Sequence, residues 1–175
     1  NTGSAAFYTD GTYLTGTTSY TLAAGQATIY VRDLTAEDIT ITATDAGLKS
    51  GTSASITVAP AGVDHFTLNA PANTTAGERA AYTVTRQDVY NNSITSGVQT
   101  VYLYRAGVTD ASAVFYDAAS GGNTITSVDI ADTASSANFW YYAQVSGDHN
   151  VTTSDATPVA DGATGIDDDT DTVAF

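Results

Sequence analysis

Short runs of alternating apolar and polar residues are the feature that most constrains this chain. In one of them, Ile39, Ile41 and Ala43 occupy every second position, with threonines between them. A period of two places the apolar side chains on one face of an extended strand and the threonines on the other. Turn residues such as Asn91-Asn92 separate neighbouring runs. Many short strands at this spacing predict an all-β antiparallel sandwich.

The predicted strands are rich in Val, Ile, Tyr and Thr, residues that favour extended backbone. No stretch carries an apolar stripe with the helical period of 3.6 residues, so no helix is predicted. The strand ranges are 5–9, 19–22, 26–32, 38–44, 53–58, 64–69, 80–87, 99–104, 113–117, 126–130, 138–145, 150–154 and 170–175.

An internal repeat organises these strands. Four segments recur in order: Gly3–Tyr8 matches Ala111–Tyr116, Ala27–Val31 matches Ala137–Tyr141, Thr42–Ala46 matches Thr152–Ala156, and Ser55–Val58 matches Thr172–Phe175. The displacement grows from 108 to 110 and then to 117 residues. We interpret this as two copies of one module, with insertions in the loops of the second copy.

The two copies are unequal. A short Pro/Gly hinge at 58–62 predicts a boundary between a domain at 1–60 and a domain at 61–175. The second copy has the segment from Val63 to Ala113 ahead of its Phe-Tyr strand, but the first has only four residues there. We therefore expect domain 1–60 to be a partial immunoglobulin-like sandwich without its first three strands, and domain 61–175 to be complete.

An incomplete sandwich leaves apolar faces and strand edges uncovered, which is unfavourable in water. Three sources can supply the missing strands. They are residues that precede the segment in a longer protein, a cleaved piece held non-covalently, or a strand from a neighbouring subunit.

Charge and composition exclude several classes of partner. The chain has 19 Asp and Glu against 5 Lys and Arg, a net charge of −14, which disfavours binding to nucleic acid and to anionic lipid surfaces. It has no cysteine, so disulfides and Cys-ligated metals are excluded. No apolar run approaches the roughly 20 residues that a membrane-spanning helix needs. The near absence of lysine and the abundance of Thr, Ser, Asn and Gly predict an extracellular, cell-surface location.

Several motifs resemble bacterial immunoglobulin-like repeats of the invasin-like type. They are 63–68 (VDHFTL), 75–78 (TAGE), 82–92 (YTVTRQDVYNN), and the closing strands 39–45 and 51–58. The resemblance implies tandem sandwich modules of S-layer, adhesin or filament surface proteins, without an active site. Arg86 departs from the family pattern, in which a small residue is commoner, and so does the acidic segment 167–171.

That acidic segment is the best candidate for a metal site. Asp167, Asp169 and Asp171 alternate with other residues, and Asp161 precedes them in a loop. Carboxylate oxygens suit Ca²⁺, which accepts flexible numbers of ligands. The alternative is a solvated edge of mutually repelling carboxylates. Calcium is the only cofactor that the sequence suggests.

Aromatic residues mark a second candidate surface. In the predicted strand 138–145, Phe139, Trp140, Tyr141 and Tyr142 follow one another, so alternation sends one pair outward. Trp140 and Tyr142 are the candidate pair for a ligand or an interface. Aromatic faces can stack on sugar rings, and a core pair combined with an inter-module contact is the alternative.

The two histidines do not form a convincing catalytic site. Asp64 precedes His65 and Asp148 precedes His149, but adjacent strand residues point to opposite faces, so neither aspartate is expected to orient its neighbour. No Gly-x-Ser-x-Gly motif is present either. We therefore predict that the chain is not an enzyme and has no catalytic residues.

Together these features predict a structural cell-surface module. It would self-assemble, or link subunits, in an S-layer, an extracellular filament or an adhesin stalk. Its partners would be other copies of itself or adjacent repeats of the same polypeptide. The alternative is an adhesin module that binds a glycan or a receptor.

Overall fold

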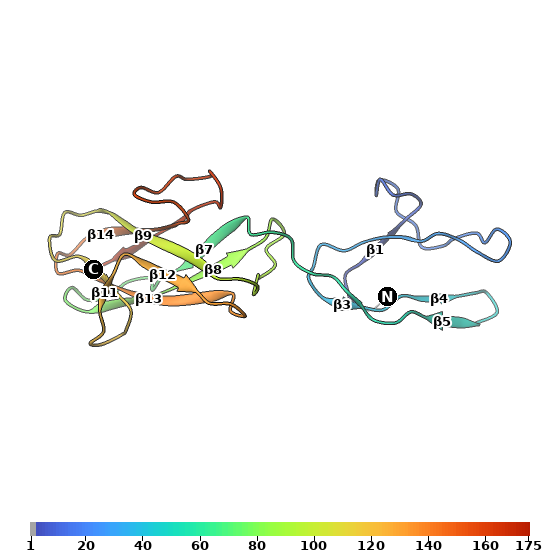
Figure 1. Ribbon diagram of the computed structural model, residues 1–175, viewed down its shortest axis with the longest axis horizontal. Coiled ribbons are helices and arrows are strands. Elements are labelled where there is room, and N and C mark those ends of the chain that lie inside the picture. The colour runs from blue at the N-terminus through green and yellow to red at the C-terminus, as the bar shows by residue number, and fades with distance from the viewer. Residues whose placement is uncertain (1–2) are drawn as a thin grey trace. The chain divides into compact units, whose positions relative to one another are not determined.

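Every regular element in the described part of the chain is a β-strand (Figure 1). The structure, a computed structural model, describes residues 3–175. The chain divides into two compact units: unit 1 ends at Pro60, and unit 2 extends from Ala61 to Phe175. No helix in the described part of the chain is long and apolar enough to cross a membrane. The all-β antiparallel class predicted from the alternation is confirmed.

Unit 2 is a sandwich of two antiparallel sheets. The five-stranded sheet has the order β11-β10-β13-β8-β7, and the four-stranded sheet has the order β12-β9-β14-β15. The strands are β7 (His65–Asn69), β8 (Arg79–Gln87), β9 (Gln99–Gly107), β10 (Val114–Tyr116), β11 (Thr124–Ile125), β12 (Ser127–Ile130), β13 (Ser136–Tyr142), β14 (Asp148–Ser154) and β15 (Asp169–Ala174).

The core of unit 2 lies between these sheets because alternate residues of each strand point inward. On β13, Phe139 and Tyr141 are fully buried. The ring of Phe139 stacks on Tyr82 of β8 with 5.2 Å between centroids, and Phe115 of β10 meets it edge-on at 5.8 Å. The opposite sheet contributes buried aliphatic side chains: Val101, Leu103, Val151 and Val173.

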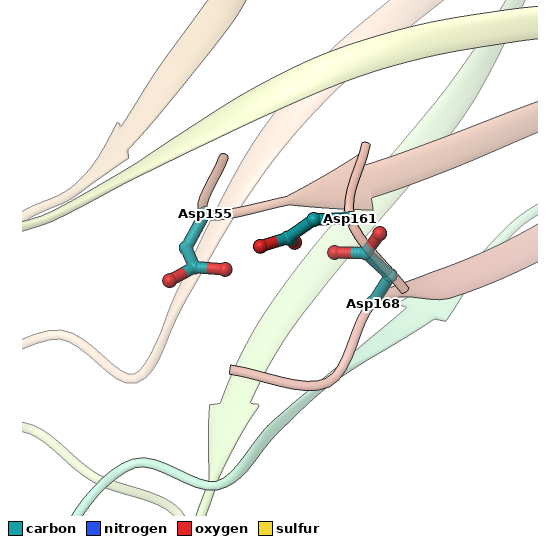
Figure 2. A group of neighbouring side chains, drawn as sticks. All are labelled: Asp155, Asp161 and Asp168. Carbon is teal, nitrogen blue, oxygen red and sulfur yellow. The ribbon is translucent and has the colours of Figure 1, made fainter. Parts of the chain in front are cut away.

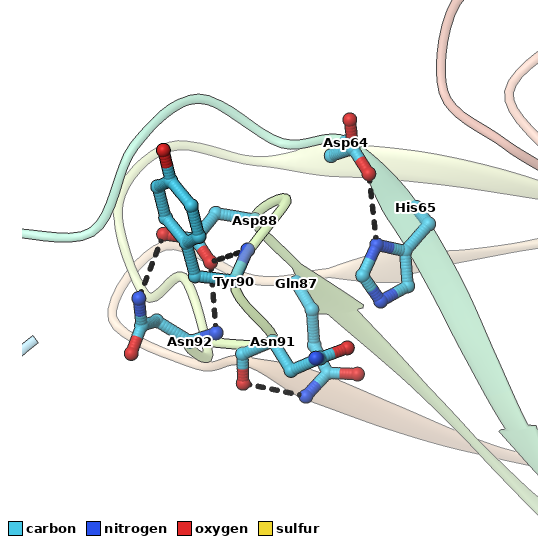
Figure 3. Close-up of polar contacts among 7 residues, drawn as sticks. All are labelled: Asp64, His65, Gln87, Asp88, Tyr90, Asn91 and Asn92. Atoms are coloured by element: carbon cyan, nitrogen blue, oxygen red, sulfur yellow. Dashed lines mark hydrogen bonds and ion pairs between the residues drawn. The ribbon is translucent and has the colours of Figure 1, made fainter. Parts of the chain in front are cut away.

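The motif after β8 forms a turn around a buried aspartate (Figure 3). The Asp88 carboxylate accepts hydrogen bonds from the backbone N–H groups of Ala61, Tyr90 and Asn92 and from the side-chain amide of Asn92. Burial by itself raises the pKa of Asp88, but these donors outweigh it and lower the pKa to about 2. Asn91 takes a left-handed conformation (φ 65°) that asparagine tolerates. The motif therefore fixes a turn and ties Ala61 to unit 2.

Arg86, the departure from the family pattern, is buried beside this turn, with 1% of its surface exposed. Its Nε donates to the carbonyl of Ile94, and its guanidinium also donates to the carbonyls of Gly97 and Ala134, each at 2.8 Å. One side chain thus connects the loop after β8 to the turn before β13. This bonding explains how unit 2 accommodates a buried cation.

Unit 1 contains three two-stranded ribbons, β1 with β2, β3 with β6 and β4 with β5. The strands are β1 (Ala6–Tyr8), β2 (Tyr30–Arg32), β3 (Asp38–Ile39), β4 (Thr42–Thr44), β5 (Ser50–Thr52) and β6 (Ile56–Thr57). Among its described residues, only Ala5 and Ile39 are buried hydrophobics. Unit 1 therefore has almost no core of its own.

The strand registers of the two units agree with the sequence repeat. In unit 1 Phe7 lies opposite Val31, and in unit 2 the matching residues Phe115 and Tyr141 lie opposite each other. Likewise, Ile39 pairs with Ile56 just as His149 pairs with Val173. The ribbon β1–β2 thus corresponds to β10–β13, and the ribbons β3–β6 and β4–β5 correspond to β14–β15.

A side-chain contact repeats as well. The hydroxyl of Thr42 lies 2.8 Å from that of Thr52, and the hydroxyls of Thr152 and Thr170 lie 2.7 Å apart. Both pairs join the two strands of the matching ribbon. The repeat therefore extends from the sequence to individual cross-strand contacts.

One predicted strand is absent. Residues 19–22 form no strand, although the segment lies 108 residues before Ser127–Ile130, which is β12. In unit 2, β12 pairs with β9. Among residues 3–60 no strand corresponds to β9, so the segment 19–22 lacks the neighbouring strand that pairs with β12 in unit 2.

Candidate functional site

Two open strand edges in unit 1 form the first candidate site. In unit 2, β13 lies between β10 and β8, and β14 lies between β15 and β9. In unit 1, β2 pairs only with β1, and β4 pairs only with β5, among residues 3–60. The edges that β8 and β9 occupy in unit 2 therefore have no strand beside them in unit 1. Such edges present backbone N–H and C=O groups to an incoming strand.

Matching residues differ sharply in exposure between the units. Ile29 is 39% exposed, whereas the matching Phe139 is 0% exposed; Ile56 is 42% exposed, whereas Val173 is 0% exposed. Ala43 is also exposed, although its match in unit 2 is buried. Burying a Val or Ile side chain stabilises a protein by about 1.5–3 kcal/mol. Burial of the inner face of unit 1 by another polypeptide segment would therefore be favourable.

A cavity lies between the ribbons of unit 1. Its volume is about 500 Å³. Its lining includes six apolar side chains, together with polar residues, Asp45 and Lys49. The apolar residues are Phe7, Leu22, Ala27, Ile29, Ile41 and Ala43. In unit 2 the equivalent space contains the packed core.

Three carboxylates gather in unit 2, in the link between β14 and β15 (Figure 2). Asp155, Asp161 and Asp168 each offer one oxygen, and the three oxygens lie within 4.8 Å of one another. The Asp161 carboxylate accepts from the hydroxyl of Ser154 at 3.3 Å, and the Asp168 carboxylate accepts from the N–H of Gly162 at 2.8 Å. These bonds hold two of the three side chains in place.

Two oxygens of this cluster are buried without a hydrogen-bond donor, namely Oδ1 of Asp155 and Oδ1 of Asp168. Unpaired buried carboxylate oxygens are costly, and three like charges at this distance repel one another. A hard cation such as Ca²⁺ would satisfy both demands, because it takes six to eight oxygen ligands. The donor set therefore fits calcium chemically.

The structure groups the predicted metal ligands differently from the sequence. Asp161 joins the cluster, but Asp169 and Asp171 accept hydrogen bonds from the backbone N–H groups of Leu68 on β7 and of Ala70, which follows β7. Asp167 is exposed, and its backbone bonds to Asp64 and Phe66. The alternating aspartates thus close the edge between the two sheets and do not lie around a common point with Asp161.

Asp155 and Asp168 were missed because loop length decides their position. The matching hairpin in unit 1 is short, and Asp45 there accepts the N–H of Lys49 at 2.9 Å. In unit 2 the link extends over 155–168, and this insertion returns Asp161 and Asp168 to the side chain of Asp155. The displacement of the repeat grows across this loop, and that growth predicted an insertion here. It does not show which carboxylates of the inserted loop meet.

Trp140 and Tyr142 lie half-buried on the outer face of β13. The ring of Tyr142 meets Tyr116 edge-on at 6.4 Å, and the guanidinium of Arg79 lies 3.4 Å from the centre of the Tyr116 ring. In the strand register Trp140 stands opposite Tyr116. These residues form a small aromatic patch on the five-stranded sheet, with Arg79 stacked on it.

The histidines occupy structural positions, but one expectation about them was wrong. Nδ1 of His65 lies 3.1 Å from the Asp64 carboxylate (Figure 3), because Asp64 precedes β7 and strand alternation does not apply to it. His149 is fully buried, and its Nε2 donates to the carbonyl of Val145. Its Nδ1 lies 2.9 Å from the hydroxyl of Tyr141.

Comparisons with known proteins place the fold. No protein-family model matches the chain, and no curated protein matches it, so sequence comparison does not support the invasin-like family. A glycosyl hydrolase family 2 member from Bacteroides cellulosilyticus resembles it in structure with a TM-score of 0.50, at 13% identity, over 97% of this chain and 21% of its own. A beta-glycosidase from Bacteroides vulgatus gives a TM-score of 0.49, at 10% identity, over 98% and 21%.

The chain thus spans about a fifth of the length of these two enzymes. At such low identity the likeness of the first enzyme shows the fold alone, which is that of β-sandwich domains.

Proposed function

We propose that the chain is a non-catalytic structural module of an extracellular surface protein. It links neighbouring copies or adjacent repeats by strand pairing at the open edges of unit 1. The observation that carries this proposal is the half-built sandwich, in which β2 and β4 lack the strands that flank their counterparts in unit 2. The S-layer, filament or adhesin stalk suggested by the family resemblance is the setting in which such linkage is useful.

The positions of the candidate chemical groups support a structural role. His149 is bonded inside the core, Arg86 donates to three carbonyls of unit 2 at 2.8 Å, and Asp88 fixes a turn. Each of these groups is engaged in holding unit 2 together. The exposed apolar surface, in contrast, is concentrated in unit 1, as at Leu22, which is 63% exposed. An apolar face beside open strand edges favours association with another polypeptide.

We expect the purified chain to self-associate through unit 1. Size-exclusion chromatography with light scattering gives the mass, and negative-stain electron microscopy shows whether the assemblies are ordered. Ile29→Lys places a charge in the apolar cavity and should restore the monomer. Thr28→Lys adds the same charge at the neighbouring exposed position and should leave assembly unchanged. A wild-type chain that stays monomeric at high concentration contradicts self-assembly.

We expect calcium to stabilise unit 2 through the three-carboxylate cluster. A ligand at 100 times its Kd stabilises the folded state by about 2.7 kcal/mol, so millimolar Ca²⁺ should raise the melting temperature by several degrees. Asp161→Asn should abolish this shift. Asp167→Asn is the matched control, because Asp167 lies in the same acidic segment but outside the cluster. Equal loss in both variants would indicate general charge screening in place of a site.

A further inference from the structure

Resting on the proposed function, we propose the identity of the segment that completes unit 1. It is a three-stranded polypeptide segment of the β7–β8–β9 type, from an adjacent repeat of the same polypeptide, which enters ahead of Gly3. Its second strand pairs with β2, and its third strand pairs with β3 and β4. Unit 1 is thus a strand acceptor with two defined edges.

Unit 2 supplies the template for the first edge. There β13 pairs with β8 in an antiparallel register, with Phe139 opposite Tyr82 and Tyr141 opposite Ala80. Because the repeat relates Phe139 to Ile29, the residue equivalent to Tyr82 lies opposite Ile29. The inward side chain at that position then fills the cavity beside Ile29.

The second edge follows in the same way. In unit 2, β14 pairs with β9, with Thr153 opposite Leu103. The repeat relates Thr153 to Ala43, which lines the cavity in unit 1 and is exposed. An apolar residue equivalent to Leu103 would cover Ala43, as Leu103 itself is buried in unit 2.

The unpaired segment 19–22 gives independent support. Its counterpart β12 exists as a strand only beside β9, with Val128 opposite Val101. Leu22 is 63% exposed, whereas the matching Ile130 is 0% exposed. One added strand of the β9 type would therefore give partners to two separate parts of unit 1, the edge of β4 and the segment 19–22.

The entry point favours a segment from the same polypeptide. Ala113, which leads from β9 into β10, is 2% exposed, and the matching Ala5 is 8% exposed. The hydroxyl of Ser112 donates to the Asp110 carboxylate, and the hydroxyl of the matching Ser4 donates to the Glu37 carboxylate at 2.8 Å. The two serines bond to carboxylates at non-equivalent positions, so the correspondence between the two entry points rests on the burial of Ala5 and Ala113.

A duplication tests this inference. A second copy of Val63–Gly107 is joined through a Gly-Ser linker to Gly3 of the full chain, and amide hydrogen exchange is measured at Tyr30–Arg32 and Thr42–Thr44. We expect exchange there to slow by about 100-fold, because both edges become interior to a cooperative sheet. The control carries Tyr82→Pro and Tyr104→Pro in the added copy only, which removes ladder donors, and should show no slowing. Tyr104 is chosen because the N–H of Leu103 donates to Thr126 on the β12 side, so that of Tyr104 points to the β14 side, opposite Thr152.

The outcomes separate this inference from the proposed function. Fast exchange in the duplicated chain, with unit 2 still protected, overturns the inference even if the original chain self-associates. Protection of the same amides only in a dimer of the duplicated chain also overturns it, because a second copy then occupies the edges in place of the joined segment. Slow exchange in a monomeric duplicated chain supports it, even if the original chain fails to assemble and the proposed linkage is rejected.

Discussion

Replacing Phe139 with alanine should lower the free energy of unfolding of unit 2 by about 3–5 kcal/mol. The side chain has no exposed surface and lies between Tyr82 and Phe115, whose rings contact it from two sides. Its removal leaves a void between the sheets that the stiff aromatic neighbours cannot close. Urea unfolding followed by the fluorescence of Trp140, the single tryptophan, measures this loss.

The repeat offers a matched control for this variant. Ile29→Ala changes the equivalent position of unit 1, where the side chain is 39% exposed, and should shift the Trp140 transition by about 0.5 kcal/mol or less. The two variants change the same position of the module. In unit 2 this position is covered by the second sheet, and in unit 1 it is exposed. A Phe139→Ala variant that lost less than about 1 kcal/mol would contradict the packing of β13 against β8.

Replacing Arg86 with methionine should destabilise unit 2 by about 3–5 kcal/mol. The substitution removes the donors to the buried carbonyl of Ile94 and to the part-buried carbonyls of Gly97 and Ala134. A buried carbonyl that loses its donor costs about 1–3 kcal/mol, and a part-buried one costs less. Methionine preserves much of the side-chain volume, so the loss reports mainly on hydrogen bonding. The same urea titration gives the free energy of unfolding.

Arg79→Met is the control for Arg86→Met. Arg79 donates to the carbonyls of Ala118 and Gly121 and stacks on Tyr116, but it lies on the partly exposed outer face of the sheet. Water can replace its hydrogen bonds there, so a loss of about 1 kcal/mol is expected. Equal losses in the two variants would show that the contribution of Arg86 to the free energy of unfolding does not depend on its burial.

The amino-acid sequence alone was enough to predict the all-β class and the correspondence between the two copies of the module. Alternation, as in Ile39, Ile41 and Ala43, is a local property of extended backbone, so it can be recognised without tertiary contacts. The repeat related Phe7 to Phe115 and Val31 to Tyr141. In unit 1 Phe7 lies opposite Val31, and in unit 2 Phe115 lies opposite Tyr141. The expectation that the first copy lacks its first three strands came from the same alignment and stays a prediction.

The tertiary structure decided which side chains meet. Asp169 and Asp171 alternate as expected, but their donors lie at the end of β7 and directly after it, about a hundred residues earlier in the chain. Asp161 meets Asp155 and Asp168 only because an inserted loop returns to the end of β14. The segment 19–22 also illustrates this dependence, because its counterpart β12 is a strand that pairs with β9.

The physical reason is the range of the interactions. The face to which a strand residue points follows from its own backbone, and the sequence specifies it directly. Strand pairing, the satisfaction of Arg86 and the convergence of the three carboxylates depend on contacts between residues that are far apart in sequence. The sequence therefore determined the fold class and the repeat, and the tertiary structure determined the carboxylate cluster and the two open edges of unit 1.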